Sequence, residues 1–380
     1  MALLPRTTQR LTSSLLRWDT FHFASIARDG YIYEYQWAFL PGTPAVMKVI
    51  GFVLHWLLGK RDLGQPLGWT ELVQAGGIGA LVCSNTQSLY RLSLHHLKSS
   101  SLAFLATLLS LLPSSPATAH YAGYADPFFT FFSYRGMLAC ARKQYVCGAL
   151  HFALATGFRS NGTLLAGYIL WGLVFERLLI YRKLPSVRAL ILSVILSMIV
   201  VAPFVFHQIL AYLTFCSSND RTLDHLPSWC SNCPPAIYSY VQSKYWNVGF
   251  LHYWTLAQLP NILLALPVLS ALVTFSVYHL HACLHTIILR SPLLSPPSDL
   301  VFSDPSLTPF TVHTVIMCAI LLFSSHTQIA LRLAPSLPTT YWAAAWLLVS
   351  YPRVGRAWVL WSVVWGAVSV VLWGVFLPPA

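Results

Sequence analysis

Long apolar segments recur from one end of this chain to the other, and they limit its fold more strongly than any other feature. The segments occupy roughly 41–59, 71–90, 101–118, 124–141, 145–181, 187–213, 259–289, 310–331 and 339–377. A helix needs about 20 residues to cross a bilayer. With 56% hydrophobic and 9% charged residues, the composition is typical of a chain surrounded by lipid. We therefore predict an all-α polytopic membrane protein, folded as a single transmembrane domain over residues 1–380.

The positive charge of the chain is explained by membrane topology rather than by a nucleic-acid partner. The formal net charge is +12, but Lys and Arg stand mostly in short gaps between the apolar segments. Basic residues in such gaps orient helices toward the cytoplasm. We expect no nucleic-acid binding. Cys230 and Cys233 form a CxxC motif, but no second ligand pair follows at zinc spacing, so we predict no metal site there.

Two of the apolar segments are too long for one helix. The segment 339–377 divides at YPRVGR (351–356), and the segment 146–176 is interrupted by RSNG (159–162). Basic residues on both sides of the second segment place both of its ends in the cytoplasm. The chain must turn between them, which places Arg159 near the luminal side. The alternative is an arginine that extends from an ordinary helix to the interface. We favour the hairpin because both halves suit short helices.

Counting spans from this hairpin gives the expected topology. Counting toward the C-terminus, residues 214–258 form a luminal loop. Counting toward the N-terminus, a chain that crosses at every apolar segment would have Asp19 in the cytoplasm. One segment between 41 and 118 is therefore expected not to cross. The proline-broken stretch LLPSSPATAH (111–120) is a candidate for a short re-entrant helix, which is tolerated only where protein or a cavity satisfies the backbone.

An aspartate stands just before the first apolar segment. Asp19 lies in RWDTFHFASIARDGYIYEYQWAFLPG (17–42), together with Trp18, His22 and several other aromatic residues. Tryptophan and tyrosine in this position are typical of an interfacial belt. A carboxylate beside lipid is costly to keep charged, so Asp19 is either a helix cap or a catalytic group. The residues alone leave both interpretations open.

Further polar side chains stand at predicted helix ends and in the long loop. They are Asp126 in HYAGYADPFF, Arg159 and Asn161 in RSNG, Gln242, Tyr245, Trp246 and Asn247 in the loop segment 234–254, and His326 and Arg332 in SSHTQIALR. The mixture of aromatic rings and hydrogen-bonding groups in the loop suits a sugar, because a pyranose has apolar faces and a hydroxylated rim. We predict that these residues bind substrate.

Six stretches of the chain, in order and over nearly its whole length, resemble the PIG-V family, the GPI mannosyltransferase 2 enzymes. They are the segment 17–42, AGYADPFF, ALATGFRSNG, IYSYVQSKYWNVGFLHYWTLAQLPNILLALPVL, HTQIALRLAPSLPTTYW and FLPP. The resemblance implies a multi-span glycosyltransferase of the C type with short re-entrant helices, and a luminal catalytic segment over 17–42. It also implies transfer of the second mannose, in α1,6 linkage, from dolichyl phosphate mannose to the GPI glycolipid precursor at the luminal side of the endoplasmic reticulum membrane.

The resemblance also implies an inverting displacement, because the donor is β-linked and the product is α-linked. Asp19 is then the base, fixed by Trp18 and His22, and Arg159 and Arg332 are the candidate phosphate partners. A lipid-phosphate donor needs no nucleotide site, and the chain has no GxGxxG or P-loop motif. We expect no protein-bound cofactor. A divalent metal bound by Asp19 and Asp126 stays an open alternative, although two scattered carboxylates are weak evidence for one.

The chain departs from the family pattern at two points. Family members carry a transmembrane helix that would deliver the Trp-Asp motif to the lumen, whereas 17 residues precede Trp18 here. Where the family has Ser-Glu after AGY, this chain has Ala125 and Asp126. The matching family segments also carry Cys216 and Cys230, which implies a disulfide in an oxidising lumen. Membrane lipid and an accessory membrane subunit are further expected partners.

Two other functions compete with sugar transfer. A transporter or lipid scramblase would keep ionisable residues near the bilayer midplane. Here the acids cluster at predicted membrane edges, and only His151 and Arg159 interrupt the apolar segments. An acyltransferase would need His151 as its base, but a lone histidine on an apolar helix is more often a packed one. The transporter or scramblase stays as the main alternative.

Overall fold

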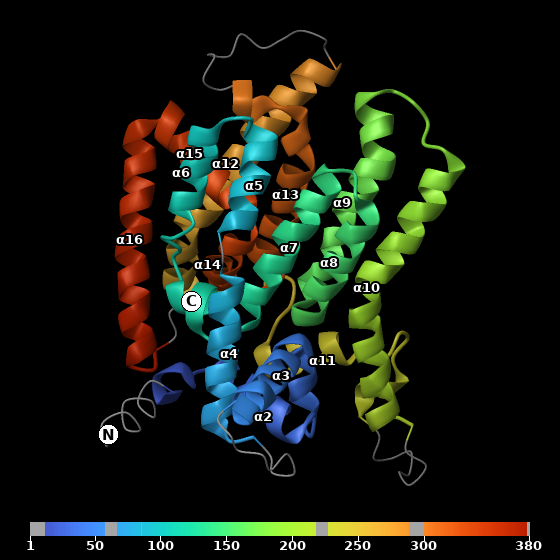
Figure 1. Ribbon diagram of the computed structural model, residues 1–380, viewed down its shortest axis with the longest axis vertical. Helices are drawn as coiled ribbons and strands as arrows, with labels where there is room; N and C mark the ends of the chain where they lie inside the picture. The colour runs from blue at the N-terminus through green and yellow to red at the C-terminus, as the bar shows by residue number, and fades with distance from the viewer. Residues whose placement is uncertain (1–11, 58–66, 85, 218–226, 289–299, 378–380) are drawn as a thin grey trace.

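The computed structural model describes residues 12–57, 67–84, 86–217, 227–288 and 300–377. Within these ranges the chain forms helices and turns and no β-strand. Most helices run side by side along the long axis of the molecule (Figure 1). The described helices that are long and apolar enough to cross a membrane are Ser160–Ile180, Val187–Phe215, Leu256–Leu284, Pro305–Phe323 and Pro352–Gly374. The prediction of an all-α polytopic membrane protein is confirmed.

The predicted hairpin around RSNG is present. Four successive stretches alternate in direction along the bundle: α7 (Ala125–Ala141), α8 (Tyr145–Phe158), the run of η3 (Ser160–Leu165), α9 (Ala166–Leu170) and η4 (Trp171–Ile180), and α10 (Val187–Phe215). Gly162 packs tightly at the turn, because a Cβ there would lie 2.6 Å from the Cα of Thr156. Arg159 therefore lies at the opposite end of the bundle from the basic residues that flank the hairpin.

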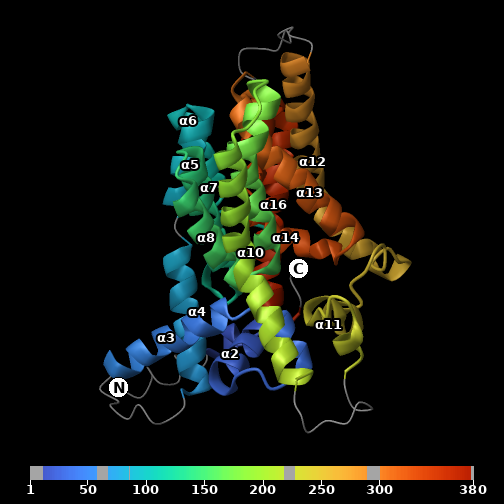
Figure 2. The same cartoon turned by 90° about the vertical axis from the view of Figure 1, so that its right-hand side faces the viewer.

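The first helices of the described chain form one end of the bundle. α2 (Asp19–Asp29), η1 (Glu34–Ala38), α3 (Gly42–Leu57) and α4 (Trp69–Cys83) lie at this end, whereas α5 (Gln87–Leu97) and α6 (Ser100–Leu109) lie toward the other end (Figure 1). Figure 2 shows α3 lying across this end, near α2, rather than along the bundle. α3 is a shorter apolar helix than any of the described candidate spans.

Helix boundaries within the first apolar segments differ from the prediction. The segment 71–90 was expected to be one helix, but α4 ends at Cys83 and α5 begins at Gln87. The hydroxyl of Ser84 lies 2.8 Å from the carbonyl oxygen of Ala80, and a serine that bonds its own backbone in this way competes with helix continuation. The apolar composition of the segment does not predict where a helix is interrupted in this way.

Two further segments also end early. α6 ends at Leu109, and the proline-broken stretch after it folds into the bundle, where Ser114 Oγ donates to the carbonyl oxygen of Leu331 at 3.1 Å. The expected span 310–331 stops at Phe323, the last residue of α13 (Thr308–Phe323). Short turns follow, including α14 (Ala330–Leu333). Side-chain hydrogen bonds satisfy the irregular backbone here, as a membrane-embedded chain requires.

The long segment 339–377 divides where the sequence predicted. α15 (Pro338–Ser350) ends before Tyr351, and α16 (Pro352–Gly374) begins with a proline at its first position. Proline has no N–H to extend the preceding helix, but it fits the start of a new one. Gly355 allows the close return, because a Cβ there would lie 2.6 Å from the backbone nitrogen of Leu348. α12 (Leu259–Ile288) packs against α15 and α13.

Candidate active site

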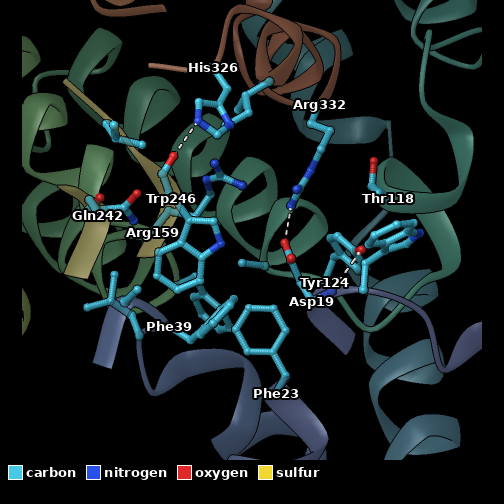
Figure 3. Close-up of a pocket in the computed structure, with 18 of the residues that line it drawn as sticks. Asp19, Phe23, Phe39, Thr118, Tyr124, Arg159, Gln242, Trp246, His326 and Arg332 are labelled. Atoms are coloured by element: carbon cyan, nitrogen blue, oxygen red, sulfur yellow. Dashed lines mark hydrogen bonds and ion pairs between the residues drawn. The ribbon is translucent and has the colours of Figure 1, made fainter. Parts of the chain in front are cut away.

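A cavity of about 370 Å³ opens at the end of the bundle that carries α2. Its walls come from α2, the start of α7, the end of α8, α11 (Ile237–Trp246) and α14. Figure 3 shows its interior, with the side chains of Arg159 and Arg332 pointing into the same space beside Asp19. The aromatic rings that line it are Trp18, Phe23, Tyr124, Phe39, Phe158, Trp246 and Trp373, together with Tyr238.

Two arginines and two aspartates from distant parts of the chain form one charged cluster at this cavity. Arg332 Nη2 donates to Asp19 Oδ2 at 2.8 Å and to Asp126 Oδ2 at 3.2 Å. Arg159 Nη1 donates to the other oxygen of Asp126 at 2.6 Å, and its Nε donates to Asn161 Oδ1 at 3.4 Å. The structure therefore brings together five of the residues that the sequence singled out.

The two carboxylates of the cluster differ in exposure. The side chain of Asp126 is 3% exposed, whereas that of Asp19 is 29% exposed and lines the cavity. Asp126 thus compensates the charge of the arginines from a buried position, and Asp19 is accessible to a molecule bound in the cavity. Burial acts to lower the pKa of Arg332, but the two carboxylates outweigh it and raise that pKa above its usual value. Arg332 therefore stays cationic.

The hydrogen bonds of Arg332 also decide whether Asp19 and Asp126 could bind a metal ion together. Arg332 hydrogen-bonds to both Asp19 and Asp126, so a guanidinium occupies the position between the two carboxylates. Among the residues that the structure describes, no group of three His, Cys, Asp or Glu side chains could hold a metal ion. The donor set at the cavity therefore does not fit a divalent metal on these carboxylates, and an arginine takes the neutralising role.

The backbone at Trp18 directs Asp19 into the cavity. Trp18 has a φ angle of 47°, which is uncommon for a bulky residue and marks local strain. Its ring stacks on Phe376 with centroids 5.2 Å apart, and the N–H of Asp19 donates to the Tyr124 hydroxyl at 3.2 Å. Burial raises the pKa of Tyr124, so this hydroxyl stays protonated. Sequence analysis missed the role of Tyr124, although it stands two residues before Asp126 in the AGY motif.

His22 lies behind the wall of the cavity rather than in it. Its ring stacks on Phe39 with centroids 4.8 Å apart and meets Tyr35 edge-on at 5.7 Å. Burial lowers the pKa of His22, against a smaller opposing effect of Asp19, so the imidazole is neutral at pH 7. His22 therefore supports Phe39, which lines the cavity, and is not itself among the residues that line it.

The predicted loop residues divide into two groups. Gln242 and Trp246 on α11 line the cavity. His326 also lines it, and its Nε2 donates to the carbonyl oxygen of Trp246 at 2.8 Å, which connects α11 to the turns before α14. Asn247 is absent from the lining and ends α11 in a left-handed conformation with φ 50°. Asparagine tolerates this conformation better than most residues, so its role here is structural.

Glu34 holds the same loop to the segment that carries Asp19. Its two carboxylate oxygens accept from the indole N–H of Trp229 at 2.8 Å and from the Tyr245 hydroxyl at 3.0 Å. Tyr245 therefore points to Glu34 and does not line the cavity. A disulfide joins Cys216 to Cys230, next to Trp229. Sequence analysis assigned no role to Glu34 within the segment 17–42, because nothing in that segment indicates which distant groups this carboxylate contacts.

His151 lies apart from the cavity. It stands on α8, where its Nδ1 lies 2.8 Å from the carbonyl oxygen of Cys147 and donates to it. It lines a separate groove between α5, α7 and α8. A histidine in this position does not share a reaction space with Asp19 and so cannot act on a substrate bound there.

Comparison with known proteins places the chain in a family. The family profile described as Mannosyltransferase (PIG-V) matches residues 2–380. A Cryptococcus neoformans protein named GPI mannosyltransferase 2 is 35% identical, over 96% of this chain and 88% of that protein. Proteins named GPI alpha-1,6-mannosyltransferase 2 from Rattus norvegicus and Homo sapiens are 34% and 33% identical, over 90% and 89% of this chain and 74% of each relative. No solved structure gives a significant match. The chain belongs to the PIG-V family of mannosyltransferases.

Proposed function

We propose that this chain transfers a mannose in α1,6 linkage during GPI-anchor biosynthesis, the activity that the names of its relatives give for them. The donor is dolichyl phosphate mannose, and the acceptor is the GPI glycolipid precursor. One observation carries the proposal: an accessible carboxylate, Asp19, faces the same cavity as Arg159 and Arg332. Transfer from a lipid phosphate needs a group that takes a proton and groups that stabilise the leaving phosphate.

Asp19 acts as the general base in the proposed reaction. Its carboxylate accepts the proton of the acceptor hydroxyl while that oxygen attacks the anomeric carbon of the mannose. The bond between the anomeric carbon and the phosphate oxygen breaks, and its electron pair stays on dolichyl phosphate. A single displacement of this kind converts the β-linked donor into the α-linked product. The 2.8 Å hydrogen bond from Arg332 and the backbone bond to Tyr124 fix the direction of the carboxylate.

Arg159 and Arg332 stabilise the leaving phosphate. Asp126 accepts one hydrogen bond from each guanidinium, which leaves other N–H groups of both arginines for phosphate oxygens. Because Asp126 orients the guanidinium groups before substrate binds, little rearrangement is needed as charge develops on the phosphate. Trp246 and Phe39 offer ring faces to the sugar, and Gln242 offers an amide to its hydroxyl groups.

We place the cavity on the luminal side of the endoplasmic reticulum membrane. Arg142, Lys143 and the basic residues between 177 and 188 lie at the other end of the bundle (Figure 1), and clusters of this kind mark the cytoplasmic side. The disulfide between Cys216 and Cys230 lies at the cavity end, where an oxidising compartment suits it.

A transfer assay in membranes tests the proposal. Microsomes that lack their own enzyme for this step receive this chain, labelled dolichyl phosphate mannose and a GPI precursor with one mannose. We expect label in a GPI glycolipid with an additional α1,6-linked mannose, and none with the Asp19→Asn variant. A transporter or scramblase would instead move labelled lipid across the membrane without forming a new glycosidic bond. That result would overturn the assignment as a transferase.

A further inference from the structure

A second, basic groove lies between α5, α7 and α8. It has a volume of about 200 Å³, and its basic side chains are Arg91, Arg135, Arg142 and His151. α7 connects it to the active site, because Asp126 stands in the first turn of this helix and Arg135 nine residues later. At 1.5 Å per residue these positions are about 14 Å apart along the axis. The groove is therefore distinct from the catalytic cavity.

In the part of the chain that the structure describes, the arginines of this groove are without a carboxylate partner. Within the described ranges, no ion pair reaches Arg91, Arg135 or Arg142, and no acidic side chain lines the groove. Arg135 lies over the ring of Phe131, 4.5 Å from its centroid. In the catalytic cluster, by contrast, both arginines pair with Asp126. Arg91, Arg135 and Arg142 are exposed, so their guanidinium groups are available to an anionic ligand at this edge of the bundle.

The position of the groove shows which kind of anion it suits. Arg142 follows the last residue of α7 and lies at the end of the bundle, and Arg135 lies two turns deeper in the same helix. The groove thus extends from the membrane edge toward the interior. Next to its residues on α8, an exposed apolar stripe is formed by Val146, Leu150 and Leu154 at four-residue spacing. Acyl chains can lie along this stripe while a phosphate meets the arginines.

We propose that this groove binds the phosphate head group of an anionic membrane phospholipid. Guanidinium groups match phosphate oxygens in fork geometry, and basic pockets between membrane helices are suited to anionic lipid head groups. Because no acidic residue lines the groove, a head group with a net negative charge suits it better than a zwitterionic one, which brings no net charge to compensate the arginines. A volume of about 200 Å³ admits a phosphate with a small polar substituent. Gln87 and Gln144 provide neutral hydrogen-bonding groups for that substituent.

Native mass spectrometry of the purified full-length chain tests the proposal by titration with phosphatidylserine and with phosphatidylcholine. The variants are Arg135→Gln and Arg142→Gln. The matched control is Arg353→Gln, an exposed arginine at the start of α16, at the same end of the bundle and outside the groove. We expect about tenfold or greater loss of phosphatidylserine affinity in each groove variant, and a change within about twofold in the control. Equal losses in all three, or equal binding of phosphatidylcholine by the wild type, would overturn the proposal.

The same titration separates a lipid from a soluble anion. Inorganic phosphate at millimolar concentration should leave phosphatidylserine bound, because it lacks the acyl chains that the apolar stripe contacts. Full displacement by inorganic phosphate would show that the site serves a soluble anion. Arg135→Lys keeps the charge and loses the fork, so we expect it to bind with an affinity between those of the wild type and Arg135→Gln.

Cysteine labelling tests the wild-type chain even if an arginine variant fails to fold. Cys147 is exposed and lines the groove, whereas Cys233 is exposed near α11, at the end of the bundle that carries the catalytic cavity. In nanodiscs, phosphatidylserine should slow the reaction of Cys147 with a thiol reagent relative to phosphatidylcholine, and Cys233 should react at the same rate in both. Equal rates at Cys147 in the two lipids would contradict a phospholipid in the groove.

Discussion

Arg332 bridges Asp19 and Asp126, with its Nη2 2.8 Å from one carboxylate and 3.2 Å from the other. One guanidinium therefore connects an accessible acid at the cavity to an acid that is buried behind it. The arrangement assigns different tasks to groups of the same chemical type. Asp19 is free to meet a substrate, and Asp126 keeps the arginines in place. The first three predictions follow from this division.

Asp19→Asn should abolish mannose transfer while the protein still accumulates in the membrane. The amide keeps the shape of the side chain but cannot take the proton of the acceptor hydroxyl, and general base catalysis is worth about 10²- to 10⁴-fold in rate. The measurement is transfer per amount of protein in microsomes. Asp29→Asn is the matched control, because Asp29 forms a surface ion pair with its neighbour Arg28. This variant should keep full activity. Normal transfer by Asp19→Asn would remove this residue from the mechanism.

Asp126→Asn should destabilise the fold as well as the reaction. The variant leaves Arg159 and Arg332 without their shared countercharge, and breaking a buried ion pair costs about 3–5 kcal/mol of unfolding free energy. Thermal unfolding in detergent measures the effect. Asp126→Glu keeps the charge on a stem that is one methylene longer and should lose much less. Equal unfolding temperatures for Asp126→Asn and the wild type would show that the arginines do not depend on this carboxylate.

Arg159→Lys should transfer mannose poorly although it expresses normally. Lysine offers a point charge without the fork that binds two phosphate oxygens, so a loss of about 1–3 kcal/mol, roughly tenfold to hundredfold in rate, is expected. A titration of dolichyl phosphate mannose measures it, with Arg188→Lys at the far end of the bundle as the control. Wild-type rates across that titration would leave Arg159 a structural role and assign the phosphate to Arg332.

Glu34→Gln should loosen the wall of the cavity that α11 provides. The carboxylate accepts from both Trp229 and Tyr245, and hydrogen bonds to a charged group contribute about 1.5–3 kcal/mol each. We expect a lower unfolding temperature and a higher KM for the donor, with a smaller effect on kcat. The matched control is Asp29→Asn, which removes the exposed ion pair between Asp29 and Arg28. It should change the free energy of unfolding by about 0–1 kcal/mol. An unchanged KM would show that this anchor does not support the site.

Much of the architecture could be predicted because it depends on local composition. The hairpin at Arg159 followed from basic residues on both sides of one apolar segment, and the division before Pro352 followed from the missing N–H of proline. The end of α4 could not be predicted in this way. Ser84 bonds to the carbonyl oxygen of Ala80 and also lies 2.9 Å from that of His120, which is far away in the sequence.

That this is an α-helical membrane protein, and which charged residues stand at the ends of its helices, could be read from the amino-acid sequence, because hydrophobicity and charge act on each segment separately. The pairing of those residues, by contrast, depends on how the helices fold together. Arg332 meets Asp19 across 313 positions of the chain, and Glu34 meets Trp229 across 195. Such contacts depend on the packing of several helices and turns against one another, and a hydrogen bond requires its atoms to lie within about 3 Å, which no local pattern of residues specifies.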